Sequence, residues 1–224
     1  MRKRFRTRLL RWFSKHARPL PWRRTRDPYK VLVSEFMLQQ TQVSRVEQYY
    51  PAFLKRFSSI EAVARARPKA VREAWEGLGY YARAANLHAL AKQVSGSGER
   101  VPDDPEELIK LPGVGRYTAG AVACFAYEKP VPAVDTNVAR VIARVFHGRE
   151  RQQVDSKDLW TIAGKIVPKD GKRAWKFNQA MMELGATVCV ARKPRCPECP
   201  VVSNCKTGRR TGRRSGVQAL SSSQ

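Results

Sequence analysis

Apolar side chains recur at helical spacing along most of this 224-residue chain, and this pattern limits the possible folds more than any other feature. The three- and four-residue spacing places these side chains on one face of an α-helix. No comparable set of segments alternates apolar and polar residues, as half-buried β-strands would. Turns that contain glycine or proline separate the segments. The sequence therefore predicts an all-α fold, with helices at residues 29–50, 60–66, 70–76, 82–94, 105–110, 117–125, 134–146, 157–166 and 174–184.

The charge of the chain points to a polyanionic partner. Lys and Arg number 43 against 19 Asp and Glu, which gives a net charge of +24. Residues 1–26 and the segment after Cys205 contain no acid, so we expect both ends to act as arms that seek phosphate groups. Residues 207–224 have almost nothing to bury and are predicted to form a disordered basic tail. A basic composition unrelated to nucleic acid is the alternative interpretation.

The location of the protein follows from what the sequence lacks. An Arg-rich, acid-poor N-terminus is also typical of mitochondrial targeting, but Leu9, Trp12 and Phe13 lead into the chain without a cleavable spacer. No apolar run approaches the length of a membrane span, and no signal-peptide core is visible. We therefore expect a cytoplasmic protein, nucleoid-associated in a prokaryote, without a membrane partner.

Four cysteines lie close together near the end of the chain, with the spacing C-x6-C-x2-C-x5-C. Thiols this close must pair or share a ligand, and disulfides are disfavoured inside cells. Zinc and an iron–sulfur cluster both remain, since four sulfurs satisfy either. A fifth cysteine, Cys124, lies on an apolar helical face and is predicted to be part of the core. The four candidate metal ligands are Cys189, Cys196, Cys199 and Cys205.

A glycine turn between two predicted helices is a candidate phosphate site. The segment Leu111-Pro112-Gly113-Val114-Gly115 lies between helices predicted to end near residue 110 and to begin near residue 116. Two glycines one residue apart allow a tight turn that presents backbone N–H groups at a helix N-terminus, where a DNA phosphate can bind. The segment is therefore predicted to be a helix-hairpin-helix motif, with a plain helix connector as the alternative.

Several motifs together resemble the endonuclease III superfamily of DNA glycosylases and, within it, the MutY adenine glycosylases. The resemblance covers almost all of residues 5–206 and is carried by the segments 20–23, 34–43, 77–81, 86–88, 111–120, 135–138 and the cysteine loop. It implies an endonuclease III-like two-domain helical fold and a 4Fe-4S cluster on the four cysteines. The implied division is a cluster domain of residues 1–25 and 136–206, a six-helix domain of residues 26–135 that carries the hairpin, and the tail of residues 207–224.

Two carboxylates are the expected catalytic pair. Hydrolysis of an N-glycosidic bond needs a proton for the leaving base and negative charge near the oxocarbenium-like sugar. Glu35 lies among apolar neighbours, which would raise its pKa, and the resemblance implies that it protonates the base and helps to activate water. The resemblance implies that Asp135, with Asn137 beside it, stabilises the sugar cation. A helix N-cap is the other role that suits Asp135.

Tyr117 bears on the type of reaction. Superfamily members with lyase activity carry a lysine just after the hairpin, where its amine forms a Schiff base with the sugar. A tyrosine cannot form this adduct, so the resemblance implies a monofunctional glycosylase. We also expect the protein to be a monomer. Its abasic product would pass to a downstream endonuclease. A core aromatic is the alternative role of Tyr117.

The remaining candidate residues are expected to contact duplex DNA that carries a mismatch. A base flipped out of the stack leaves a gap and an orphan partner. Gln40 and Tyr80 are suited to enter the stack beside the orphan base, as the matching MutY residues do. Further candidates for DNA contact are Arg23, Gln39, Thr41, Gln42, Leu78, Tyr81, Gly113, Val114, Gly115 and Thr118.

Departures from the family pattern leave the substrate open. MutY enzymes typically continue into a domain that checks for 8-oxoguanine, and the resemblance implies a MutY-like protein that lacks it. Thr136 replaces a usual glycine, and Ala85 replaces a usual arginine. Thymine glycosylases of similar length also have a tyrosine at the position of Tyr117 and a non-glycine residue between the aspartate and the asparagine. Adenine opposite G or 8-oxoguanine is the expected substrate, T or U opposite G is the alternative, and a non-catalytic iron–sulfur DNA-binding protein is the lesser alternative.

Overall fold

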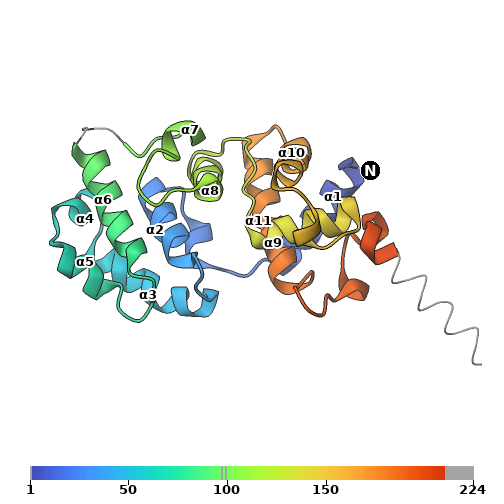
Figure 1. Cartoon of the computed structure of the whole chain (residues 1–224), viewed down its shortest axis with the longest axis horizontal. Helices are drawn as coiled ribbons and strands as arrows, with labels where there is room; N and C mark the ends of the chain where they lie inside the picture. Colours follow the sequence, from blue (N-terminus) through green and yellow to red (C-terminus); the bar gives the residue numbers. More distant parts are fainter. Residues whose placement is uncertain (1, 97, 99, 210–224) are drawn as a thin grey trace, which may run out of the picture. The chain divides into compact units, whose positions relative to one another are not determined.

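All regular elements in the described part of the chain are helices (Figure 1). The computed structural model describes residues 2–96, 98 and 100–209 of the chain. The predicted all-α class is confirmed. The chain divides into two compact units, which we call the terminal unit, residues 1–18 and 130–224, and the central unit, residues 19–129.

Both boundaries between the units lie earlier in the chain than the expected ones after residues 25 and 135. The first boundary lies before residue 25 because Trp22 is buried in the central unit. The centre of its ring is 5.6 Å from that of Tyr50, in an edge-on arrangement. The second moves because Asn178 holds the segment before residue 135. The Asn178 side chain donates to the carbonyl of Val131 at 2.9 Å and accepts from the amide of Ala133 at 3.2 Å. Asp135 therefore belongs to the terminal unit.

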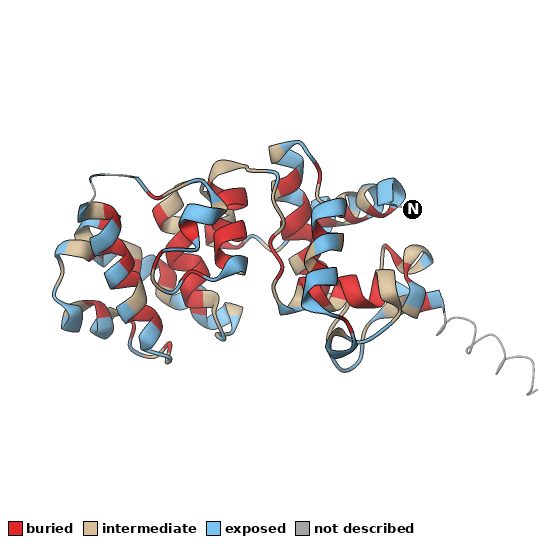
Figure 2. Cartoon of the chain, turned by 45° about the horizontal axis from the view of Figure 1, so that its top comes forward, coloured by how far each residue is buried: buried red, intermediate tan, exposed pale blue. Residues whose placement is uncertain are grey.

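The central unit is built around two helices that are buried on nearly all sides. Helix α2 carries eight buried residues and α8 carries nine (Figure 2). A helix that is apolar all round suits the middle of a core, and α2 packs against α3, α6 and α8. The helices of this unit are α2 (Pro28–Leu38), α3 (Val43–Arg56), α4 (Ile60–Arg65), α5 (Pro68–Ala74), α6 (Ala82–Gly96), α7 (Pro105–Leu108) and α8 (Arg116–Tyr127), preceded by a 3-10 turn at Pro21–Arg24.

The predicted single helix over residues 29–50 is wrong, because the structure has two helices with a break between them. Helix α2 ends at Leu38 and α3 begins at Val43. Within the break, Gln40 has a φ of 55°, a left-handed conformation that ends an α-helix. Apolar spacing continues across the break, so the periodicity alone did not reveal it.

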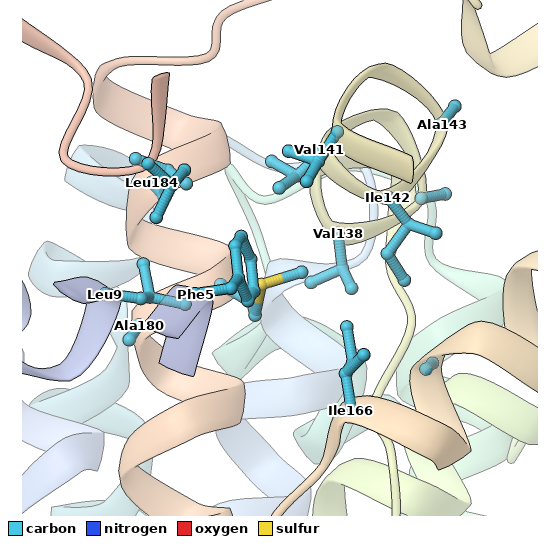
Figure 3. Close-up of a cluster of buried hydrophobic side chains, with 14 of the residues drawn as sticks. Phe5, Leu9, Val138, Val141, Ile142, Ala143, Ile166, Ala180 and Leu184 are labelled. Atoms are coloured by element: carbon cyan, nitrogen blue, oxygen red, sulfur yellow. The ribbon is translucent and has the colours of Figure 1, made fainter. Parts of the chain in front are cut away.

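The terminal unit joins the two ends of the chain through one apolar core. Figure 3 shows Phe5 and Leu9 in one cluster with Val138, Ile166 and Leu184; these five side chains come from four different helices. These are α1 (Arg2–His16), α9 (Thr136–Ile142), α10 (Ser156–Ile166) and α11 (Gly171–Thr187); one π-helical turn, Ala143–His147, continues α9, and short 3-10 turns follow at Arg151–Gln153, Cys196–Glu198 and Val202–Asn204.

The N-terminal segment differs from the expected arm. Residues 2–16 form α1, which buries Phe5, Leu9 and Phe13 on one face and carries its basic residues on the other. The four-residue spacing of these three aromatic and aliphatic side chains explains the helix. The segment is a structural element of the terminal unit rather than an unstructured arm.

The start of the predicted disordered tail is also wrong. Residues 206–209 are helical, and the hydroxyl of Thr207 donates to the carbonyl of Arg144 at 3.0 Å. The remainder of the expected tail, residues 210–224, lies outside the described residues. None of the described helices combines the length and apolar character that a membrane crossing requires.

Candidate functional site

Buried Glu35 and half-buried Tyr117 form a hydrogen-bonded pair in the central unit. Glu35 is on α2 and only 3% exposed, and Tyr117 is in the first turn of α8. Because α2 packs against α8, the two side chains meet, and the Tyr117 hydroxyl donates to Glu35 Oε2 at 2.7 Å. The pair joins residues 82 positions apart. A carboxyl group in an apolar setting with a hydroxyl donor on one oxygen is suited to hold and transfer a proton.

Asp135 is the N-cap of α9 in the terminal unit. Its Oδ1 accepts from the amide of Val138 at 2.6 Å, and its Oδ2 accepts from the Asn137 side chain at 3.0 Å. Burial raises the pKa of Asp135, while these hydrogen bonds and the charge of Arg140 oppose the rise. The capping role is therefore present, and the same hydrogen bonds orient the carboxylate.

Arg140 connects this cap to the cysteine loop. Its Nη2 donates to Asn137 Oδ1 and to the carbonyl of Gly185, both at 2.8 Å, and its Nε donates to the carbonyl of Cys189 at 2.8 Å. Gly185 permits the close approach, since a Cβ there would lie 2.6 Å from the Cβ of Asn137. Sequence reasoning missed Arg140 and Gly185, because only the packing of α9 on α11 brings them to this point.

The glycine segment forms a tight turn between α7 and α8, as the helix-hairpin-helix prediction requires. Gly113 has a φ of 74°, and a Cβ there would lie 2.7 Å from the Cβ of Asn86, so only glycine fits. Gly113 and Gly115 are exposed, and Gly115 is the N-cap of α8 without a side-chain hydrogen bond. The amide of Val114 donates to the carbonyl of Leu111 at 3.1 Å. The exposed backbone at the start of α8 is thus the part suited to a phosphate.

Thr118 and Leu78, both candidates for DNA contact, have buried side chains. Thr118 is 3% exposed within α8, and Leu78 is 5% exposed. Gln40 and Tyr80, by contrast, have exposed side chains, and Tyr80 is 62% exposed. Both have left-handed backbones, with φ values of 55° and 47°. A single buried residue that sequence reasoning missed, Arg83, bonds the two loops that carry them.

The other residues expected to contact DNA vary in exposure. Gln42 and Tyr81 are exposed, and the guanidinium of Arg72 lies 4.9 Å from the Tyr81 ring centre. Gln39, Thr41 and Arg23 are half-buried, the last in the 3-10 turn Pro21–Arg24.

All four cysteines of the loop line one cavity in the terminal unit, together with apolar side chains such as Val141, Leu184 and Val201. The cysteines form no disulfide. Burial raises the pKa of Cys199 to about 12, so without a metal it is a neutral thiol. No three Cys, His, Asp or Glu residues in the described ranges are arranged to hold a single metal ion. Cys124 is fully buried in α8, so its predicted core position is confirmed.

Arg144 fastens the loop around this cavity. Its guanidinium donates to the carbonyls of Val190 and Ala191, each at 2.8 Å, and lies 3.7 Å from Cys189 Sγ. Its own carbonyl accepts from Cys205 Sγ at 3.4 Å. The guanidinium also forms an ion pair with Glu150 at 2.9 Å, so its charge is shared between this carboxylate and the cysteine loop.

Comparison with known proteins agrees with this arrangement. Residues 33–164 match the model of the HhH-GPD superfamily base excision DNA repair proteins. The chain is 48% identical over 200 residues to the adenine DNA glycosylase of Mycolicibacterium smegmatis, covering 88% of this chain and 67% of that protein. It is 40% identical over 206 residues to the thymine-DNA glycosylase of Aeropyrum pernix, covering 89% of this chain and 92% of that protein.

Solved structures of DNA repair enzymes have a similar fold. A thermostable thymine-DNA glycosylase superposes with a TM-score of 0.85 at 33% identity, covering 93% of this chain and 97% of that chain. A trapped endonuclease III–DNA covalent intermediate has a TM-score of 0.78 at 26% identity, covering 94% of this chain and 98% of that chain. The chain spans 65% of the length of the adenine DNA glycosylase of Mycobacterium tuberculosis and 40% of that of the human one.

Proposed function

Because the chain belongs to the HhH-GPD superfamily of base excision DNA repair proteins, we propose that it is a monofunctional DNA glycosylase that removes adenine opposite G or 8-oxoguanine. The observation that carries the proposal is the pair in which half-buried Tyr117 donates to buried Glu35 at 2.7 Å. A tyrosine hydroxyl cannot form the Schiff base that a lyase needs. The product is therefore an abasic site, which a separate endonuclease would process.

Glu35 supplies the proton in this reaction. Adenine leaves as an anion unless it is protonated, so an acid beside the base lowers the barrier. The Tyr117 hydroxyl donates a hydrogen bond to one oxygen of Glu35. The proton for the leaving base is carried on the Glu35 carboxyl group. The buried setting keeps water away from the acid before substrate binds.

Asp135 stabilises the positive charge that develops on the sugar. Hydrogen bonds from Val138 and Asn137 fix its two oxygens in place, so the carboxylate needs no reorganisation as the charge develops. Asn137 is a positioning residue in this scheme. Water then attacks the sugar cation, and Glu35, having given up its proton, can accept one from that water.

Duplex DNA with a mismatch is the proposed partner. The exposed backbone of Gly113 and Gly115 would hold a phosphate at the start of α8, and the net charge of +24 would supply the rest of the attraction. Gln40 and Tyr80 would enter the base stack beside the orphan base. We propose that the enzyme acts as a monomer in the cytoplasm, or on the nucleoid of a prokaryote.

A 4Fe-4S cluster on Cys189, Cys196, Cys199 and Cys205 completes the proposal. The residues present fit this group, because the four cysteines line one cavity and a guanidinium donor of Arg144 lies 3.7 Å from Cys189 Sγ. When bound, the cluster would supply iron–thiolate bonds that tie the loop together and a redox-active centre.

Metal analysis tests the cluster. The purified protein should hold iron and acid-labile sulfide and absorb broadly in the visible range. Cys199→Ser should lose both, whereas Cys124→Ser, which changes a buried cysteine outside the cavity, should keep them. Stoichiometric zinc without iron would refute the cluster.

Removal of thymine or uracil opposite G is the second candidate. It is favoured by the TM-score of 0.85 to a thymine-DNA glycosylase and by the 92% coverage of the Aeropyrum pernix enzyme, whereas the higher sequence identity, 48% against 40%, favours adenine. The decisive experiment treats labelled duplexes carrying A:G, A:8-oxoguanine, T:G or U:G with the protein and then with alkali. Strand breaks at adenine support the proposal, and breaks only at T or U establish the alternative. Tight binding without excision of any base would leave a non-catalytic DNA-binding protein.

A further inference from the structure

The two loops that carry Gln40 and Tyr80 meet at one buried arginine. The first loop, residues 39–42, follows α2, and the second, residues 77–80, precedes α6. Arg83 lies in the first turn of α6 and is only 6% exposed. An arginine this deeply buried needs hydrogen-bond partners for its whole guanidinium group, because an unsatisfied buried charge is very unfavourable.

Each side of the guanidinium bonds a different loop. Nη1 lies 3.0, 2.8 and 2.6 Å from the carbonyl oxygens of Phe36, Met37 and Gln39. These atoms form the end of α2 and the start of the first loop.

On the other side, Nη2 donates to the carbonyls of Leu78 and Gly79 at 3.1 and 2.9 Å, and Nε donates to that of Tyr80 at 3.4 Å. Among the described residues no carboxylate forms an ion pair with Arg83, so carbonyl dipoles, with the rings of Trp75 and Tyr80 at 5.6 Å, balance its charge. The carbonyl dipoles include the negative end of the α2 dipole.

Each loop contains one residue in a strained conformation, and Arg83 donates a hydrogen bond to a backbone carbonyl next to each of these residues. Gln40 and Tyr80 have positive φ angles, which non-glycine residues rarely adopt. Such conformations persist only where surrounding contacts enforce them. Arg83 bonds the carbonyl before Gln40 and those of Gly79 and Tyr80, and its guanidinium also lies 5.6 Å from the centre of the Tyr80 ring.

We propose that Arg83 is a positioning residue that locks the two loops into one rigid unit, so that Gln40 and Tyr80 enter the base stack together. The inference rests on the proposed glycosylase function and adds to it the residue that sets the spacing of the two inserting side chains. Arg83 itself, being buried, touches no DNA. Its loss would let each loop relax separately and would weaken recognition of the mismatch more than binding to the phosphate backbone.

Arg83→Lys is the direct test, with Arg56→Lys as its matched control. Lysine keeps the charge but has fewer donors and no planar fork, so it cannot bond both loops at once. Arg56 lies in the same unit, where its guanidinium bonds Glu73 on the surface at 3.3 Å and lies 5.5 Å from the centre of the Phe57 ring. The readouts are the affinities for one duplex with and without the mismatch that the wild type cleaves, and amide hydrogen exchange of the free protein.

Arg83→Lys should reduce the preference for the mismatched duplex by about tenfold or more, whereas affinity for the paired duplex changes by less than about twofold. Amides of residues 39–42 and 77–80 should exchange faster, and Arg56→Lys should match the wild type in all readouts. An unchanged preference in Arg83→Lys would overturn the inference. So would equal losses on both duplexes with faster exchange throughout the central unit, since these indicate general destabilisation. If the wild type itself excises no base and prefers no mismatch, the proposed function fails, and the inference fails with it.

Discussion

Gly185 offers a sharp test of how closely α9 and α11 must approach to place Asp135. In Gly185→Ala, the new Cβ would lie 2.6 Å from the Cβ of Asn137 and 3.0 Å from its carbonyl oxygen. Both helices lie in the core of the terminal unit, so neither can move freely. Overpacking of this kind costs about 1–3 kcal/mol. Alanine stabilises a helix by about 1 kcal/mol relative to glycine, so the free energy of unfolding should fall by up to about 2 kcal/mol in total.

Gly164→Ala is the matched control. Gly164 lies on α10 in the same unit, and a Cβ there would meet nothing within 4 Å. This variant should gain about 1 kcal/mol of unfolding free energy from helix propensity alone. The two alanine variants should therefore differ by about 1–3 kcal/mol in urea unfolding, a difference that comes only from the contact with Asn137.

The same contact links stability to activity. Displacing Asn137 would weaken its hydrogen bonds to Asp135 and to Arg140, at 3.0 and 2.8 Å. Single-turnover base excision by Gly185→Ala should fall by about tenfold or more, measured where both variants are fully folded, while Gly164→Ala keeps the wild-type rate. Equal stabilisation of the two variants with equal rates of excision would refute the packing argument.

Three further predictions concern the proposed chemistry. Glu35→Gln keeps the shape of the side chain but cannot deliver a proton, so mismatch binding should survive while single-turnover excision falls by about 10²-fold or more; excision at the wild-type rate would remove Glu35 from the mechanism. Burial raises the pKa of Asp135, so the folded state keeps a proton that the unfolded chain releases, and stability falls as pH rises through that window. Asp135→Asn can still cap α9 but lacks the negative charge, so it should excise no base. It should resist urea better than the wild type at pH 7, and this advantage should shrink as the pH falls toward 3.8, the ordinary pKa of an aspartate. Equal urea midpoints for the two proteins at both pH values would contradict this. Truncation after Arg209 removes Arg210, Arg213 and Arg214, so the slope of log affinity against log salt should decrease by about 1 to 3, and an unchanged slope would show that these residues make no phosphate contact.

The local features of this protein could be predicted from the sequence. Helical spacing predicted the all-α class, and the segment 111–115 predicted a tight turn whose Gly113 has a positive φ. Cys124 was correctly placed in the core by its apolar helical face. Each of these depends on residues within a few positions of one another, where spacing and residue type determine the conformation.

Other features depended on contacts between distant segments. Periodicity predicted one helix where α2 and α3 are separate, because the helical spacing of apolar residues continues across the break at Gln40. The N-terminal residues looked like a charged arm because eleven of the first 26 residues are basic, and the burial of Phe5 and Leu9 became visible only with α11 and α9 beside them.

The supporting residues of the candidate site belong to this second group. The sequence indicated the candidate chemical groups, namely the two carboxylates, the tyrosine and the four cysteines. Only the tertiary structure decided which residues support the site. Arg140, beside Asn137, bonds carbonyls 45 and 49 positions away, and Arg83, between the loops that carry Gln40 and Tyr80, bonds carbonyls 44 to 47 positions away. A backbone carbonyl is present at every residue, so no residue type marks it as a partner in the sequence; the packing of the helices alone selects it.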